Sequence, residues 1–214
     1  MRHFILKKLF KGGRQGITMI ELLTVIAVLL IIIIISVANF NSSNKISELR
    51  NATDQLADNL RDLQSKTLAN IKEYENQTVE EYELGYKLKF NMNDNQIAYD
   101  EIVSPTENLT DLNARYESLP VKSLNPNHIF SKIEIIENGN PIEKSYYNIM
   151  YLFPEAQIYL IENESLPLNQ SELNAQSTRS ELKLYIKRNG MTNWQGIVTI
   201  DRVSGKITSI IESI

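Results

Sequence analysis

Cysteine is absent from this chain of 214 residues. Its absence excludes disulfide bonds, thiol catalysis, lipoprotein acylation and cysteine-based metal sites. Histidine is scarce as well, because His128 is the only one besides His3, near the start. The sequence also contains no histidine pair for zinc, no Gly-x-Ser-x-Gly motif of hydrolases and no glycine-rich phosphate loop. We therefore expect neither an enzyme nor a bound cofactor.

The acidic residues do not complete a metal-binding motif. Asn93-Asp94-Asn95 is similar to the start of a calcium loop, and Asp100 and Glu101 follow within eight residues. The loop glycine at position 6 and the glutamate at position 12 are missing from that register. We therefore expect no metal site.

Glycine and proline are both absent between Ile17 and Leu84. This gap predicts one nearly continuous helix from Ile17 to about Glu73, roughly 85 Å long at 1.5 Å per residue. Its first part, residues 17–38, is apolar on every face and contains one acidic residue, Glu21. An apolar run of this length can span a bilayer. Because no second such run exists, we expect a single transmembrane helix.

The residues around the start of this apolar run form a recognisable signal. A basic stretch ends at Gly16 and is followed, from Ile17, by Ile-Thr-Met-Ile-Glu-Leu-Leu. Over roughly residues 12–40 the chain resembles the prepilins of the type IV pilin and pseudopilin family. The resemblance implies that a prepilin peptidase cleaves between Gly16 and Ile17, and that Ile17 is then N-methylated. It also implies that Glu21 pairs with an N-terminal amine, its own or a neighbouring subunit's, during filament assembly.

Physical chemistry agrees with this role for Glu21. An ammonium at residue 17 and a carboxylate at residue 21 can neutralise each other in a dry helix bundle, where an unpaired charge is costly. The carboxylate also lies in the first helical turn, where the helix dipole favours negative charge. The alternative is an acid near the membrane face that lipid head groups solvate.

The resemblance implies a function and a set of partners. The chain would be a structural subunit of a type IV pilus-like or type II secretion-like filament, inserted in the membrane as a prepilin and assembled through its N-terminal helix. Its partners would be a prepilin peptidase, other pilin or pseudopilin subunits, an inner-membrane assembly platform and membrane lipid.

Several details differ from the usual pilin pattern. Ile17 stands where phenylalanine is commonest, no proline interrupts the apolar helix, and the lack of cysteine excludes the C-terminal disulfide loop of many pilins. The missing proline and a loop-rich domain favour a minor pilin or pseudopilin. A second, more distant resemblance, through Phe153-Pro154 and the closing hairpin with Gly205, is to the minor group that includes H-type pseudopilins.

An ordinary secretory signal is an alternative interpretation of the same residues. Leu22–Ile35 has the length of a signal-peptide apolar region, and Ser36-Val37-Ala38 is a small-x-small cleavage site. The mature protein would then begin at Asn39 and be a secreted binding module. Without cleavage it would be a membrane-anchored module. An acid at the start of the apolar region and the long polar leader argue against this interpretation.

Charge is distributed unevenly along the chain. Residues 1–16 carry five basic side chains and no acidic one. The basic residues are Arg2, Lys7, Lys8, Lys11 and Arg14. Without them, 17 basic and 26 acidic residues remain, a formal charge of −9. The positive-inside rule predicts a cytoplasmic N-terminus and an extracytoplasmic C-terminal domain. The resemblance implies that this domain is carried, after assembly, in a periplasmic or cell-surface filament. The acidity disfavours non-specific nucleic-acid binding.

A change of pattern divides the rest of the chain. We expect a leader at 1–16, a transmembrane and assembly helix at 17–38, an amphipathic helix at 39–73 and a β-rich globular domain at 74–214. The amphipathic part has a heptad-like stripe: Ile46, Leu49, Thr53, Leu56, Leu60, Leu63 and Thr67. Such a stripe packs on the chain's own sheet or, alternatively, forms a coiled-coil seam. Residues 39–44 are poor helix formers and predict a soft spot between the two helical parts.

Short β-like runs bounded by turn residues follow the helix. We predict strands at Tyr86–Phe90, Gln96–Val103, Ile129–Ile136, Tyr146–Phe153, Gln157–Ile161, Leu182–Lys187, Gly196–Ile200 and Lys206–Ile210. Residues 104–127 and 162–180 are predicted to be long loops. The fold class is thus α+β, with a long N-terminal helix packed on a small antiparallel sheet.

Basic residues near the C-terminus suggest one further surface. They are Lys187, Arg188, Arg202 and Lys206, with Tyr185 and Trp194 close in sequence. Such a patch can contact DNA. The alternative is an ordinary solvated hairpin surface, and we expect no clear nucleic-acid binding.

Overall fold

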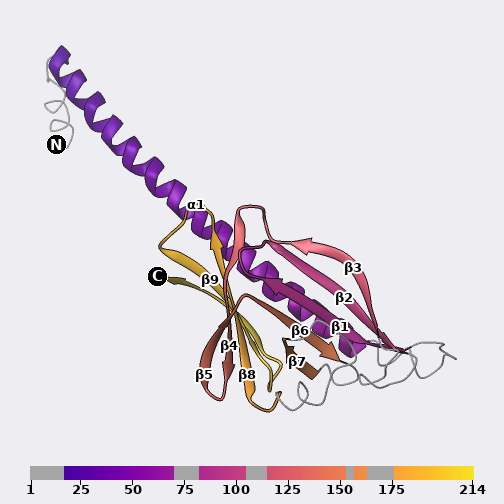
Figure 1. Ribbon diagram of the computed structural model, residues 1–214. Helices are drawn as coiled ribbons and strands as arrows, with labels where there is room; N and C mark the ends of the chain where they lie inside the picture. The colour runs from indigo at the N-terminus through magenta and orange to yellow at the C-terminus, as the bar shows by residue number, and fades with distance from the viewer. Residues whose placement is uncertain (1–16, 70–81, 105–114, 153–156, 163–175) are drawn as a thin grey trace, which may run out of the picture. The chain divides into compact units, whose positions relative to one another are not determined.

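The computed structural model describes residues 17–69, 82–104, 115–152, 157–162 and 176–214. Within these residues the chain forms one long helix and then ten strands (Figure 1). The elements are α1 (Met19–Ala69), β1 (Tyr82–Asn91), β2 (Gln96–Ser104), β3 (Arg115–Ser123), β4 (His128–Glu137), β5 (Asn140–Lys144), β6 (Tyr146–Leu152), β7 (Gln157–Ile161), β8 (Arg179–Arg188), β9 (Trp194–Asp201) and β10 (Ile207–Ser213). The predicted α+β class is confirmed. The chain divides into two compact units between Asn44 and Lys45.

The first unit contains the apolar part of α1. Every side chain from Ile17 to Val37 is exposed, and the large apolar ones among them are at least 49% exposed. Among the described residues, α1 is the one helix long and apolar enough to cross a membrane. Length and composition of this kind indicate membrane insertion or secretion.

The helix runs without a break from Met19 to Ala69. Residues 39–44, where we expected a soft spot, are therefore helical. Helix propensities differ by only about a few tenths of a kcal/mol per residue, and the helical turns on either side can outweigh such differences. The predicted end near Glu73 lies outside the described residues.

The second unit begins with the amphipathic part of α1. In the predicted stripe, all residues from Leu49 onward are buried, and Ile46 is half-buried. The hydroxyls of Thr53 and Thr67 are satisfied within the helix, donating to Leu49 O and Leu63 O at 2.8 Å each. The stripe packs on the chain's own strands, so the coiled-coil alternative is wrong.

The amphipathic part of α1 packs against two five-stranded antiparallel sheets, whereas we expected a single sheet. Sheet A has the order β3-β2-β1-β6-β7, and sheet B has the order β10-β9-β8-β4-β5. The main core lies where α1 and both sheets meet, and it includes Leu60 of α1, Ile149 of β6 and Leu184 of β8, each 0% exposed. Across the two sheets, the rings of Phe90 and Phe130 contact edge to face with centroids 5.4 Å apart.

Two strands were missed by the sequence pattern. Strand β3 lies inside the predicted loop 104–127, and β5 follows the turn at Asn138-Gly139. Both are outer strands that contain proline and lack the apolar alternation of a half-buried strand. Of the second predicted loop, 162–180, Arg179 and Ser180 belong to β8, and 163–175 lie outside the described residues.

Candidate functional site

The first turn of α1 is closed by a reciprocal pair of polar contacts. Thr18 donates to Glu21 Oε2 through its backbone N–H and its hydroxyl, both at 2.8 Å. In return, the Glu21 N–H donates to Thr18 Oγ1 at 3.3 Å. This is a capping box, with Thr18 as N-cap and Glu21 as the third helical residue. It satisfies two backbone donors that the helix start leaves without a partner.

The capping box places Glu21 beside the predicted cleavage site. Ile17, which cleavage would make the first residue, directly precedes Thr18 and is 75% exposed. Gly16 lies outside the described residues, so cleavage and methylation stay predictions. Thr18 is a functional candidate that our sequence reasoning missed, although the Thr-x-x-Glu spacing at 18–21 is the sequence signature of a capping box.

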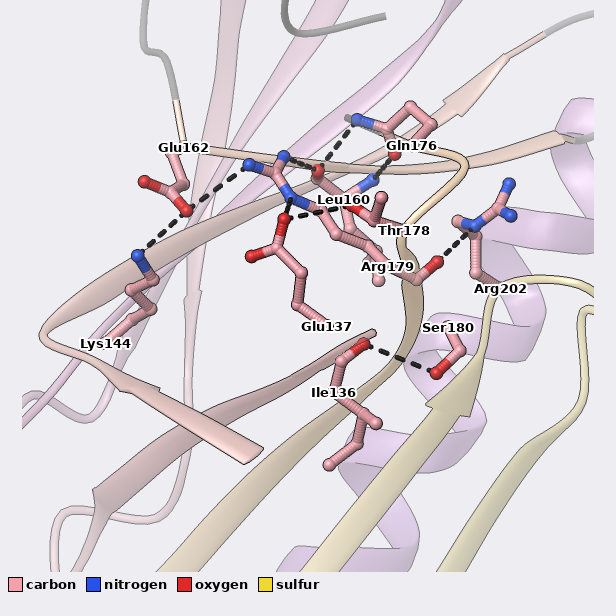
Figure 2. A network of polar contacts seen from close by, with 10 residues as sticks. All are labelled: Ile136, Glu137, Lys144, Leu160, Glu162, Gln176, Thr178, Arg179, Ser180 and Arg202. Carbon is pink, nitrogen blue, oxygen red and sulfur yellow. Dashed lines mark hydrogen bonds and ion pairs between the residues drawn. The ribbon is translucent and has the colours of Figure 1, made fainter. Parts of the chain in front are cut away.

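A buried arginine organises a second polar cluster, in the domain (Figure 2). The Arg179 side chain of β8 is 7% exposed. Its Nη2 lies 3.3 Å from Glu162 Oε1, and its Nε lies 3.9 Å from Glu137 Oε1. Lys144 of β5 also pairs with Glu162 Oε1, at 2.9 Å. Two cations thus face two carboxylates, and this cluster ties the two sheets together.

The same cluster covers the outer edge of sheet A at β7 (Figure 2). The amide of Gln176 brackets Leu160, accepting from its N–H at 2.8 Å and donating to its carbonyl at 2.9 Å. Arg179 Nη1 donates to that carbonyl too, at 2.6 Å. Open backbone groups on an edge strand invite pairing with another chain. At Leu160, the side chains of Gln176 and Arg179 occupy both of these backbone groups.

The remaining outer strands of the two described sheets are protected in other ways. At β10, Arg61 of α1 donates through Nη2 to the carbonyl of Ile207 at 2.8 Å. Strand β5 has five residues and contains Pro141. Strand β3 contains Pro120 and Lys122 and faces an irregularity in its pairing with β2. Short strands, proline, lysine and bulges all oppose edge-to-edge association.

The four basic residues proposed for a DNA patch are not brought together. Lys187 and Arg188 end β8, whereas Arg202 and Lys206 follow β9 at the opposite end of the pairing between β8 and β9. Arg202 lies opposite Ser180, seven residues before Lys187 on β8, which corresponds to about 23 Å at 3.3 Å per residue. Arg188 Nε is engaged by Glu48 Oε2 at 2.8 Å, and Arg202 Nε donates to Arg179 O at 2.6 Å.

Two of the acidic residues considered for calcium, Asp94 and Asp100, make contacts within the domain. Asp94 Oδ1 accepts from the backbone N–H groups of Asn95 and Gln96 in the turn between β1 and β2. Asp100 pairs with buried Lys87 at 3.1 Å, and Lys87 Nζ lies 3.5 Å from the ring centre of Tyr116. Burial, and secondarily the Asp100 charge, raise the pKa of Tyr116. The described residues contain no cluster of three potential metal ligands.

Comparison with known proteins adds no relative: no family model, curated protein or solved structure matches the chain. The architecture itself is pilin-like, because a long apolar N-terminal helix continues into a part that packs on antiparallel sheets.

Proposed function

We propose that this chain is a structural subunit, a minor pilin or pseudopilin, of a type IV pilus-like or type II secretion-like filament. The observation that carries the proposal is the first half of α1. Its apolar side chains are exposed on every face, and its one acidic side chain is held at the helix start by Thr18. Lipid covers such a helix before assembly, and the helices of other subunits cover it afterwards.

The features that oppose pairing at the sheet edges support assembly through the helix. All four outer strands of the described sheets are capped, shortened or interrupted, so growth by strand pairing is opposed. The exposed helix offers the larger apolar surface. The domain would therefore form the outer layer of the filament and the helix its core.

The charge of Glu21 supports a partner from outside the helix. Residues 17–44 contain no lysine, arginine or histidine, so no side chain of that segment can neutralise the carboxylate. An acid within a membrane-inserted segment is costly and points to a functional partner. Cleavage after Gly16 would supply the missing cation as the amine of Ile17, on the same chain or on a neighbour.

This function involves no chemistry by the chain itself. A prepilin peptidase would cut and methylate it, an inner-membrane platform would lift it from the lipid, and other pilin or pseudopilin subunits would receive it. The N-terminus would lie in the cytoplasm before cleavage, and the domain would lie outside.

Substitutions at Glu21 test the proposal in cells. Glu21→Ala and Glu21→Gln should leave membrane levels and cleavage largely intact but reduce the protein in sheared filaments at least tenfold. Removing one partner leaves the other charge buried alone, at about 3–5 kcal/mol. Ser36→Ala is the matched control, because Ser36 is another exposed polar residue of α1 whose hydroxyl donates only to Ile32 O. Normal amounts of Glu21→Ala protein in filaments would refute the assembly role.

A further inference from the structure

His128, at the start of β4, occupies an unusual position for a titratable residue. Its side chain is 0% exposed. Neither ring nitrogen makes a hydrogen bond of good geometry among the described residues, although the Asn125 backbone lies near the ring. A buried imidazole in this setting is stable only when it is neutral, because protonation would place an unsolvated cation in the domain interior.

An ion pair between two other elements lies next to this ring. His128 is the direct cross-strand partner of Arg188 on β8. Arg188 Nε in turn donates to Glu48 Oε2 of α1 at 2.8 Å. Glu48 belongs to the first turn of the helix that follows the boundary between Asn44 and Lys45. The three residues therefore join α1 to two strands of sheet B.

Burial and the Arg188 charge disfavour protonation of His128. Burial lowers its pKa most, and the Arg188 charge lowers it further. Glu48 and the backbone of Asn125 act in the opposite direction. Of the neighbouring elements, α1 contributes Glu48 and, one turn earlier, half-buried Lys45, and β8 contributes Arg188.

We propose that His128, Arg188 and Glu48 form a pH-sensitive latch that holds the first domain turn of α1, residues 45–49, on sheet B. A protonated His128 needs an acceptor or water. The Oε2 atom of Glu48 already accepts from Arg188. Protonation of His128 therefore lifts the helix turn and admits water to the ring, which breaks the contact between Glu48 and Arg188. The latch belongs to the domain alone and does not depend on filament assembly.

The sign of the pH dependence follows from linkage. Because the unfolded or open form binds the proton more readily, the closed latch is fully stable above about pH 6.5, the ordinary pKa of histidine. It weakens as the pH falls from there toward the lower pKa of the closed form. Each unit between the two pKa values corresponds to a tenfold change in the opening equilibrium, about 1.4 kcal/mol.

A distance measurement on the full chain in lipid nanodiscs tests the latch. The chain has no cysteine, so spin labels can be placed on two exposed residues, Ser47→Cys on α1 and Asn189→Cys after β8. Between pH 7.5 and 5.0, we expect the population at longer distances to increase at least tenfold. A control pair at the other end of the helix, Ser65→Cys and Ser204→Cys, should keep its distance distribution.

Two variants and one titration keep the test decisive. His128→Gln should abolish the pH response, and Glu48→Gln, at a half-exposed position, should populate the longer distances at both pH values. The midpoint of opening should coincide with the midpoint of the His128 ring titration, followed by NMR in the unsubstituted chain. A distance distribution independent of pH, an unchanged response in His128→Gln, or two separate midpoints would overturn the latch.

Discussion

The two halves of α1 belong to one unbroken helix but differ completely in their surroundings. From Ile17 to Val37 every side chain is exposed, whereas the stripe from Leu49 to Thr67 is buried against two sheets. The second half is amphipathic and finds its partner within its own chain. The first half is apolar on all faces and has no packing partner among the described residues of its unit. The amphipathic half is thus part of the domain core, whereas the exposed apolar half is suited to membrane insertion or secretion.

The largest expected effect comes from a charge in the buried half. Leu56→Asp should unfold the domain, because Leu56 is 0% exposed and an unpaired buried charge costs several kcal/mol of a total stability of about 5–15 kcal/mol. The measurement is the thermal melting of the full chain in detergent. Gln55→Asp, on the neighbouring exposed position, is the control and should melt like the unsubstituted protein. Equal melting of both variants would mean that the stripe does not face the core.

Breaking the Arg179 cluster, which ties the two sheets together, should have the next largest effect on stability. Arg179→Leu would leave Glu137 and Glu162 without their shared cation and would remove one of the two donors to the carbonyl of Leu160. We expect a loss of about 3 kcal/mol in the free energy of unfolding, measured by urea denaturation. Arg50→Leu, at an exposed position on α1, is the control. If Arg179→Leu loses less free energy of unfolding than the control, the cluster contributes nothing to the stability of the domain.

A substitution at the close contact between α1 and sheet B should have a smaller effect on stability. A Cβ atom added at Gly196 would lie 2.0 Å from Thr53 Oγ1, so α1 and β9 must separate to accept it. We expect Gly196→Ala to lower the free energy of unfolding by about 1–3 kcal/mol. In a double-mutant cycle, Thr53→Ala should recover part of this loss, because it removes Oγ1, the closest atom, and Cγ2, and keeps only Cβ at 3.1 Å. Strictly additive losses would contradict the contact.

The smallest effect is expected in the hairpin between β9 and β10. The buried half of α1 contacts this hairpin where Gln64 donates to the carbonyl of Gly205. Asp201 accepts from the N–H groups of Ser204 and Val203, and these contacts lower its pKa. Their stabilisation is therefore present above about pH 4, the ordinary value, and is lost as the pH falls through the lower pKa of the folded state. Asp201→Asn should melt slightly earlier at pH 7, and the gap should close below pH 4. A gap that stays constant with pH would exclude a charge effect.

The fold was predictable where periodicity was strong. The stripe on α1 and eight strands with apolar residues or turn signals were recognised from the sequence, and the described residues contain all of them, although Phe153, the predicted end of one strand, lies outside these residues. The outer strands β3 and β5 were missed because Pro120, Pro141 and exposed side chains remove the alternating pattern. The division into two sheets was also missed, since strand order depends on long-range pairing that local patterns do not encode.

The candidate sites were predictable to different degrees. Glu21 stood out because a single acid interrupts an apolar run, and the Thr18 contact could have been found from its spacing. The Arg179 cluster could not, because Glu137, Lys144, Glu162 and Gln176 come from separate elements and meet only in the folded domain. The latch at His128 is of the same kind, since Glu48 is 80 residues earlier in the chain.

The N-terminal residue of the mature protein tests the central claim most directly, because it shows whether the apolar half of α1 is kept. Protein purified from membranes of the native host, or of a host with a prepilin peptidase, can be analysed by terminal sequencing and intact mass. Our account predicts Ile17 as the first residue, with the added mass of one N-methyl group. Asn39 would mean that the apolar half is a discarded secretory signal, and an uncut Met1 would mean that it is a simple anchor. Either result would contradict the proposal that this half of the helix is kept to assemble a filament.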